Sequence, residues 1–143
     1  MTERALDERM MRRAIALAAS RLGRTGDNPA VGCVIARGAS VIAEAATAPG
    51  GRPHAEEQAV ALAGDAARGA TAYVTLEPCG ERSSGAPSCS ERLIEAGVSR
   101  VVFAAANPHA LSAGRGPARL RAAGIVVDKG LLADRARALY VDL

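Results

Sequence analysis

One histidine and two cysteines stand at the ends of predicted secondary-structure elements, although they lie far apart in the sequence. His54 opens a helix, Cys79 lies just past the end of an apolar strand, and Cys89 opens a second helix. In sheets covered by helices, ligands bind at the edge where strands reach their carboxyl ends. A fold that brings one strand end and two helix starts to such an edge would join these side chains at a single point. No other feature of the chain restricts its fold as strongly.

These three side chains are suited to a zinc ion. Imidazole nitrogen and thiolate sulfur are preferred Zn²⁺ ligands, and three protein ligands leave the fourth position open for water, as in catalytic zinc sites. Helix N-termini favour the thiolate form of cysteine. We therefore predict that His54, Cys79 and Cys89 bind Zn²⁺. Glu56 is not needed as a ligand, and it lies close enough to His54 in the sequence to handle the protons of that water.

Three other residues with suitable side chains are given different roles. Cys33 lies in an apolar run, which predicts a buried strand thiol. Glu57 is interpreted as a solvated neighbour of Glu56, although a helix considered alone does not show which of the two faces inward. His109 is the only other histidine, and its loop position favours a substrate pocket or a plain surface over metal ligation.

Apolar periodicity and turn residues predict strands that alternate with helices after an opening hairpin. The predicted helices span residues 6–22, 54–67, 89–96, 116–123 and 131–140, and the predicted strands span residues 31–36, 41–45, 72–76, 100–105 and 125–127. Alternating strands and helices favour a largely parallel sheet covered on both faces, which the hairpin makes mixed. Without a linker or an internal repeat, the 143 residues are predicted to form one domain.

Composition argues against nucleic-acid and membrane partners. The net charge is only +3, aromatic residues make up 2%, and the chain has no polybasic run, whereas single-strand binders combine a basic groove with stacking rings. Residues 2–13 are highly charged, and no apolar run approaches the length of a membrane span. We expect a cytoplasmic protein, in which cysteines stay reduced and three of them indicate metal binding or catalysis before disulfides.

The motifs resemble those of the cytidine-deaminase superfamily, and within it those of the deaminases of bacterial riboflavin biosynthesis. An H-x-E motif followed by Pro-Cys is typical of zinc-dependent deaminases, and the long gap between the two cysteines is a trait of the riboflavin branch. The resemblance covers nearly the whole chain and rests on Thr25-Gly26-Asp27-Asn28-Pro29-Ala30-Val31-Gly32-Cys33-Val34, His54-Ala55-Glu56 and Tyr73-Val74-Thr75-Leu76-Glu77-Pro78-Cys79.

The resemblance implies a three-layer α/β/α sandwich with a five-stranded mixed sheet, and a homo-oligomer. It implies a zinc-dependent hydrolase that deaminates a phosphorylated pyrimidine, the diaminohydroxyphosphoribosylaminopyrimidine intermediate of riboflavin biosynthesis. Glu56 would then shuttle protons, and Asn28 would contact the substrate. Asn107 and His109 fall in a region that shapes the family's substrate pocket, and Arg82 is a candidate for the substrate phosphate because arginine makes bidentate contacts with such anions. Arg115 is a further candidate, and an ordinary surface role is the equal alternative for both arginines.

Departures from the family pattern leave alternatives open. Asp27 stands where the family usually has proline, the loop between Cys79 and Cys89 is one residue longer, and Asn107-Pro108-His109-Ala110 replaces Asp-Pro-Asn-Pro. A deaminase of another nucleobase, nucleotide or small heteroaromatic amine is therefore the second hypothesis. A silent zinc domain that serves as a partner subunit is the third, against which the retained Glu56 argues. Family members are commonly fused to a C-terminal reductase domain, which we expect to be a separate protein here.

Overall fold

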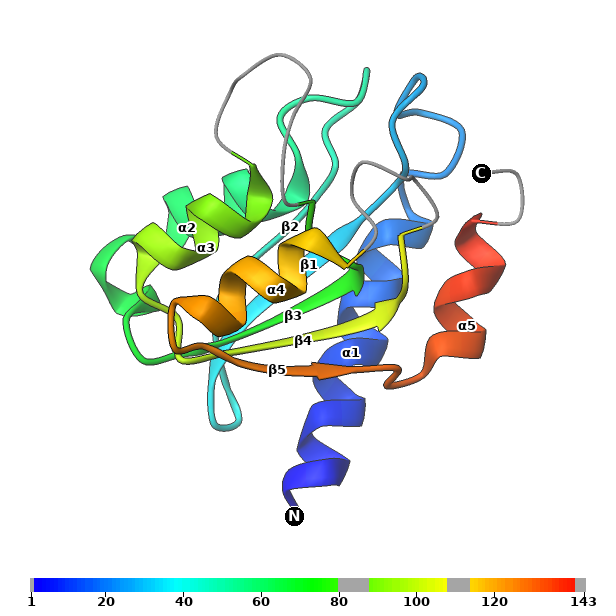
Figure 1. Cartoon of the computed structure of the whole chain (residues 1–143). Helices are drawn as coiled ribbons and strands as arrows, with labels where there is room; N and C mark the ends of the chain where they lie inside the picture. Colours follow the sequence, from blue (N-terminus) through cyan, green and yellow to red (C-terminus); the bar gives the residue numbers. More distant parts are fainter. Residues whose placement is uncertain (1, 80–87, 108–113, 141–143) are drawn as a thin grey trace.

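The computed structural model describes residues 2–79, 88–107 and 114–140, which fold around one five-stranded sheet (Figure 1). The strands lie in the order β2-β1-β3-β4-β5. β1 pairs antiparallel with β2 and β3, whereas β3–β4 and β4–β5 are parallel. The strands are β1 (Gly32–Arg37), β2 (Ser40–Ala46), β3 (Thr71–Leu76), β4 (Arg100–Ala105) and β5 (Val126–Lys129). The predicted mixed sheet is confirmed, but it is less parallel than expected because half of its pairings are antiparallel.

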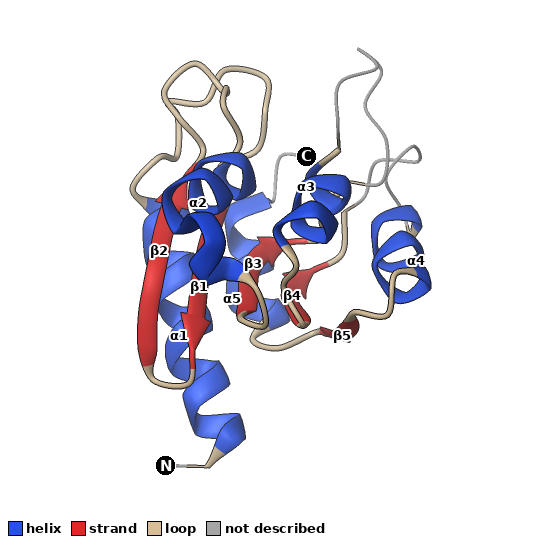
Figure 2. Cartoon of the chain, turned by 90° about the vertical axis from the view of Figure 1, so that its left-hand side faces the viewer, coloured by secondary structure: helices blue, strands red, loops and turns tan. Residues whose placement is uncertain are grey.

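Helices cover both faces of the sheet (Figures 1 and 2). One face carries α1 (Glu3–Ala19), which packs against β1 and β3, and α5 (Ala133–Arg137), which packs against β4. The other face carries α2 (Ala55–Ala63), α3 (Cys89–Ala96) and α4 (Arg115–Ala122), which contact one another in sequence order. Two 3₁₀ helices, η1 (Gly64–Ala67) and η2 (Ala138–Tyr140), continue α2 and α5. This is the expected three-layer α/β/α sandwich.

Small and branched apolar side chains fill both sides of the sheet, as a chain with so few aromatic residues requires. Every residue of β4 after Arg100 is buried, which is the pattern of a central strand with both faces covered. Gly32 allows α1 to lie directly on β1, because a Cβ atom there would come within 1.9 Å of the carbonyl oxygen of Ala14. Burial of apolar surface on both faces stabilises the sheet, and its carboxyl-end edge is left for the site.

All the predicted helices and strands are present, and most of them begin or end at residues other than those predicted. α1 begins earlier than predicted because Thr2 caps it, accepting a hydrogen bond from the amide of Ala5 at 3.1 Å. It also ends earlier, so that Leu22 lies beyond it and is 48% exposed instead of continuing the apolar stripe. The predicted second helix starts one residue late and finishes as η1, while α3 has the predicted bounds and ends at left-handed Gly97.

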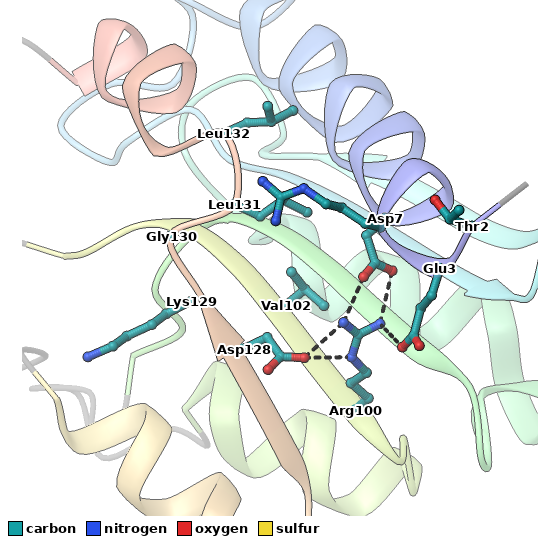
Figure 3. A pocket seen from close by; sticks show the side chains of 11 residues that line it. Thr2, Glu3, Asp7, Arg100, Val102, Asp128, Lys129, Gly130, Leu131 and Leu132 are labelled. Atoms are coloured by element: carbon teal, nitrogen blue, oxygen red, sulfur yellow. Dashed lines mark hydrogen bonds and ion pairs between the residues drawn. The ribbon is translucent and has the colours of Figure 1, made fainter.

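An ion pair lies at the end of the sheet where β4 begins, among residues that line a pocket (Figure 3). Arg100 at the start of β4 donates to both carboxylate oxygens of Asp7 on α1, at 2.9 and 2.7 Å. Tyr73 donates to the same carboxylate at 2.6 Å, and Arg100 also pairs with Asp128 at 2.8 Å. Burial opposes ionisation of Asp7, but the bonds from Arg100 and Tyr73 outweigh it and lower the pKa of Asp7. The pair fastens α1 to the central strands.

Replacing Asp7 with asparagine is expected to lower the free energy of unfolding at pH 7 by about 2 kcal/mol, since a partly buried charge loses its partner while Arg100 keeps Asp128. The pKa of Asp7 is lower in the folded than in the unfolded chain, so its contribution is complete above about pH 4 and is lost as the pH falls through the folded pKa. Urea denaturation at pH 7 and between pH 3 and 5 should show the asparagine variant losing less stability on acidification. An equal loss in both proteins would contradict this.

Candidate metal and active site

The predicted zinc ligands are brought to one edge of the sheet by two helix starts and a strand end. His54 is the N-cap residue of α2, Cys89 is the first residue of α3, and Cys79 follows β3. The Nδ1 atom of His54 lies 3.5 Å from the Sγ atom of Cys89. The Sγ atom of Cys79 accepts a hydrogen bond from the amide of Cys89 at 3.3 Å. Cys89 therefore contacts both His54 and Cys79, and zinc binding by the three residues stays a prediction.

The donor types, and the spacing of one pair of them, fit a zinc ion. Nitrogen and sulfur ligands on a tetrahedral zinc lie about 3.6 Å apart, which matches the separation of His54 Nδ1 and Cys89 Sγ. The hydrogen bond from the backbone amide of Cys89 to Cys79 Sγ is the kind of contact that orients a ligating thiolate. Within residues 2–79, 88–107 and 114–140, no three His, Cys, Asp or Glu side chains are gathered closely enough to hold an ion as they stand. The fit therefore rests on the donor chemistry and on these two distances.

Glu56 lies on the inner side of α2 and is only 4% exposed. Its negative charge affects the pKa of two side chains, Cys33 and Tyr140. Burial raises the pKa of Cys33 on β1, and the negative charge of Glu56 raises it further. Burial also raises the pKa of Tyr140 on η2; a hydrogen bond with Thr75 opposes this rise, while the charge of Glu56 adds to it. Glu56 thus points into the molecule, and Cys33 is the buried strand thiol that was predicted.

Glu57 is not the solvated residue that was expected. Its side chain is 16% exposed, and it pairs with Arg92 of α3 at 3.5 Å. Its other carboxylate oxygen lies 4.0 Å from Nδ1 of His54. The interpretation failed because it considered α2 alone, whereas α3 packs beside α2 and provides a cation there. The Glu57–Arg92 pair joins the two helices that carry His54 and Cys89.

The residues expected to bind substrate are only partly described. Asn28 is half-buried, and its Nδ2 atom donates to the carbonyl of Gly51 at 2.9 Å, which turns its Oδ1 atom the other way. Asn107 is half-buried just beyond β4, and Arg115 is the exposed first residue of α4. Arg82 and His109 lie outside the described residues.

Sequence reasoning missed the residues that pack behind Cys79. Glu77 is buried, and its carboxylate accepts a hydrogen bond from the amide of Gly114 at 2.8 Å. A Cβ atom on Gly116 would lie 1.9 Å from the carbonyl oxygen of Pro78. The start of α4 thus rests directly on the backbone that leads into Cys79. The only sequence feature that pointed to this contact was the pair of glycines on either side of Arg115, at the start of the helix.

Comparison with known proteins identifies the family of the chain. Residues 4–105 match the zinc-binding region of the cytidine and deoxycytidylate deaminases. The chain is 41% identical to the riboflavin biosynthesis protein RibD of Aquifex aeolicus over 139 residues, which are 97% of this chain and 39% of that protein. It is 41% identical to a diaminohydroxyphosphoribosylamino-pyrimidine deaminase of Buchnera aphidicola over 129 residues, covering 89% of this chain and 86% of that one. The structure of Acinetobacter baumannii RibD superposes with a TM-score of 0.91 at 44% identity, over 96% of this chain and 39% of that chain.

Proposed function

The chain belongs to the cytidine and deoxycytidylate deaminase family, and we propose that it hydrolytically removes an exocyclic amine from diaminohydroxyphosphoribosylaminopyrimidine. The observation that carries the proposal is that Cys89 contacts both His54 and Cys79, while Glu56, two residues after His54, is buried. The Buchnera relative, which this chain covers over most of its length, bears the name of this activity. The chain spans about two fifths of the RibD proteins that it matches, so a role within riboflavin biosynthesis is part of the proposal.

We assign zinc binding to His54, Cys79 and Cys89. When bound, the ion supplies a Lewis acid that lowers the pKa of a water molecule at its open position toward about 7. Glu56 would take one proton of the attacking water and deliver it to the ring nitrogen. It would then move the remaining proton of that oxygen to the departing amine, as the carbonyl forms and the C–N bond breaks. Its burial excludes competing water from the carboxylate. The products are the corresponding ring carbonyl compound and ammonia.

We assign substrate binding to Asn28, Asn107, Arg82 and His109. The support is strongest for Asn28, because its bond to Gly51 fixes the amide and leaves an oxygen acceptor available for a substrate donor. Arg82 is chosen for the phosphate because a guanidinium binds phosphate oxygens in pairs. Arg115, exposed at the start of α4, is the other candidate for that contact.

Assembly and partners stay predictions. We propose that these residues act as a deaminase domain in a homo-oligomer, and that a reductase consumes the product. Among the described helices, none is long and apolar enough to cross a membrane.

The decisive experiment measures ammonia release by the full chain from four substrates. Diaminohydroxyphosphoribosylaminopyrimidine should be deaminated with a higher kcat/KM than cytidine, cytidine monophosphate or guanine. A clear preference for one of the other three would replace the substrate and retain the chemistry. No release from any of the four by protein that contains zinc would contradict the proposal and support the silent zinc domain.

Removing the metal should stop the reaction. Treatment with a strong chelator is expected to reduce ammonia release to background, because the open metal position is lost and Glu56 has no activated water to deprotonate. Added Zn²⁺ should restore activity, and Mg²⁺ should not, because it prefers oxygen ligands to thiolates. The thermal midpoint should fall with the metal and recover with it. Full activity after the zinc has been removed, checked by elemental analysis, would exclude the proposed chemistry.

A further inference from the structure

The segment that carries Asn28 is held by side-chain hydroxyl groups. Residues 28–32 lead from the loop after α1 into β1. The carbonyl of Asn28 accepts from Thr25 Oγ1 at 2.6 Å, and that of the next residue accepts from Thr47 Oγ1 at 3.1 Å. Thr47 Oγ1 also accepts from the amide of Val31 at 2.9 Å. Thr25 is near the segment in the sequence, and Thr47 is the residue directly after β2.

The carbonyl of Ala30 is bound from a distant part of the chain. The hydroxyl of Tyr140, on η2, donates to it at 2.8 Å. Tyr140 has one hydroxyl proton, so at its 2.7 Å contact with Thr75 it must be the acceptor and Thr75 the donor. Thr75 Oγ1 in turn accepts from the amide of Gly32 at 3.1 Å. The hydrogen bonds thus run in one direction, from the amide of Gly32 through the hydroxyls of Thr75 and Tyr140 to the carbonyl of Ala30. Each hydroxyl accepts one bond and donates one.

This chain of bonds includes a residue of the strand that leads to Cys79. Thr75 is completely buried near the carboxyl end of β3, the strand that leads to Cys79. Gly32 and Ala30 flank the residue at which the segment enters β1. Burial raises the pKa of Tyr140, and the negative charge of Glu56 adds to that rise. A contact from η2 therefore reaches the backbone two residues after Asn28, the proposed substrate contact.

We propose that Tyr140 is a positioning residue: its hydroxyl fixes Ala30, and through Ala30 sets the place of Asn28 relative to Glu56. The inference rests on the proposed function, in which Asn28 binds substrate and Glu56 moves protons. A residue that only places a binding group affects ground-state and transition-state binding alike, so its loss raises KM while kcat is maintained. Tyr140 has no part in the reaction itself.

The test replaces Tyr140 with phenylalanine, which keeps the ring and removes the hydroxyl. Tyr73→Phe is a matched control, because it also removes a hydroxyl that makes a short side-chain contact, with Asp7 at 2.6 Å at the opposite end of the sheet. For Tyr140→Phe we expect KM to rise about tenfold, since the carbonyl of Ala30 loses its donor, while kcat and zinc content stay close to those of the wild type. Tyr73→Phe should lower thermal stability without raising KM.

Hydrogen exchange gives a readout that does not depend on activity. In Tyr140→Phe, the amide of Gly32 should exchange faster, because Thr75 loses the partner that orients its hydroxyl. Thr75→Val should raise KM as Tyr140→Phe does, and the double variant should be little worse than either single variant, since both changes break the same chain of bonds.

An unchanged KM in Tyr140→Phe, an equal rise in Tyr73→Phe, or a fall in kcat at constant KM would each overturn the inference while the deaminase assignment stands. If the wild-type chain deaminates none of the substrates, the proposed function fails, and exchange at Gly32 alone then decides the inference. Unchanged exchange there would reject it.

Discussion

Replacing Glu56 with glutamine is expected to lower kcat by at least about 10²-fold while the protein retains its zinc. Glutamine has nearly the same shape and fits the same buried position, but its amide does not accept the proton of the attacking water. Glu56 is 4% exposed, so bulk water does not easily replace it as a base. Steady-state ammonia release and elemental zinc analysis on the same preparation measure both effects.

Glu57→Gln is the matched control, with the same change of charge one residue later on α2. Glu57 pairs with Arg92 and approaches His54, so the variant should bind zinc somewhat more weakly but keep kcat within about threefold of the wild type once zinc is saturating. If instead Glu57→Gln lost turnover and Glu56→Gln retained it, the proton shuttle would have been assigned to the wrong carboxylate.

The part of the site that follows from local pattern could be predicted from the sequence. His54 follows a loop rich in proline and glycine, Cys79 follows an apolar strand, and Cys89 begins an amphipathic helix, so each position was marked by its own neighbours. The order of elements then leads their ends to one edge of the sheet. Thiol and imidazole chemistry supplied the rest of the zinc prediction.

The parts that were missed depend on contacts between distant segments. Glu56 and Glu57 are adjacent and chemically alike, and only the packing of α3 beside α2 separates a buried carboxylate from one paired with Arg92. Tyr140 was predicted simply as the end of a helix, because nothing near it indicates that its hydroxyl reaches Ala30. Such assignments require the tertiary arrangement, which periodicity does not contain.

The second large effect is expected at Gly116, where a single methyl group should destabilise the protein. In Gly116→Ala the new Cβ atom would lie 1.9 Å from the carbonyl oxygen of Pro78 and 2.7 Å from Oγ of Ser90. Because the first contact is with backbone, α4 must move away from the strand end. We expect the free energy of unfolding to fall by about 3 kcal/mol, despite the higher helix propensity of alanine. Urea denaturation measures the loss.

Gly114→Ala separates this clash from the ordinary cost of replacing a glycine. Gly114 has a φ of 74°, and a Cβ atom there would meet nothing within 4 Å, so the variant should lose only about 1 kcal/mol. Since Pro78 directly precedes Cys79, Gly116→Ala should also weaken zinc binding in a chelator competition, whereas Gly114→Ala should not. Equal losses of stability in the two variants, with zinc affinity unchanged in both, would mean that α4 does not support the backbone that holds Cys79.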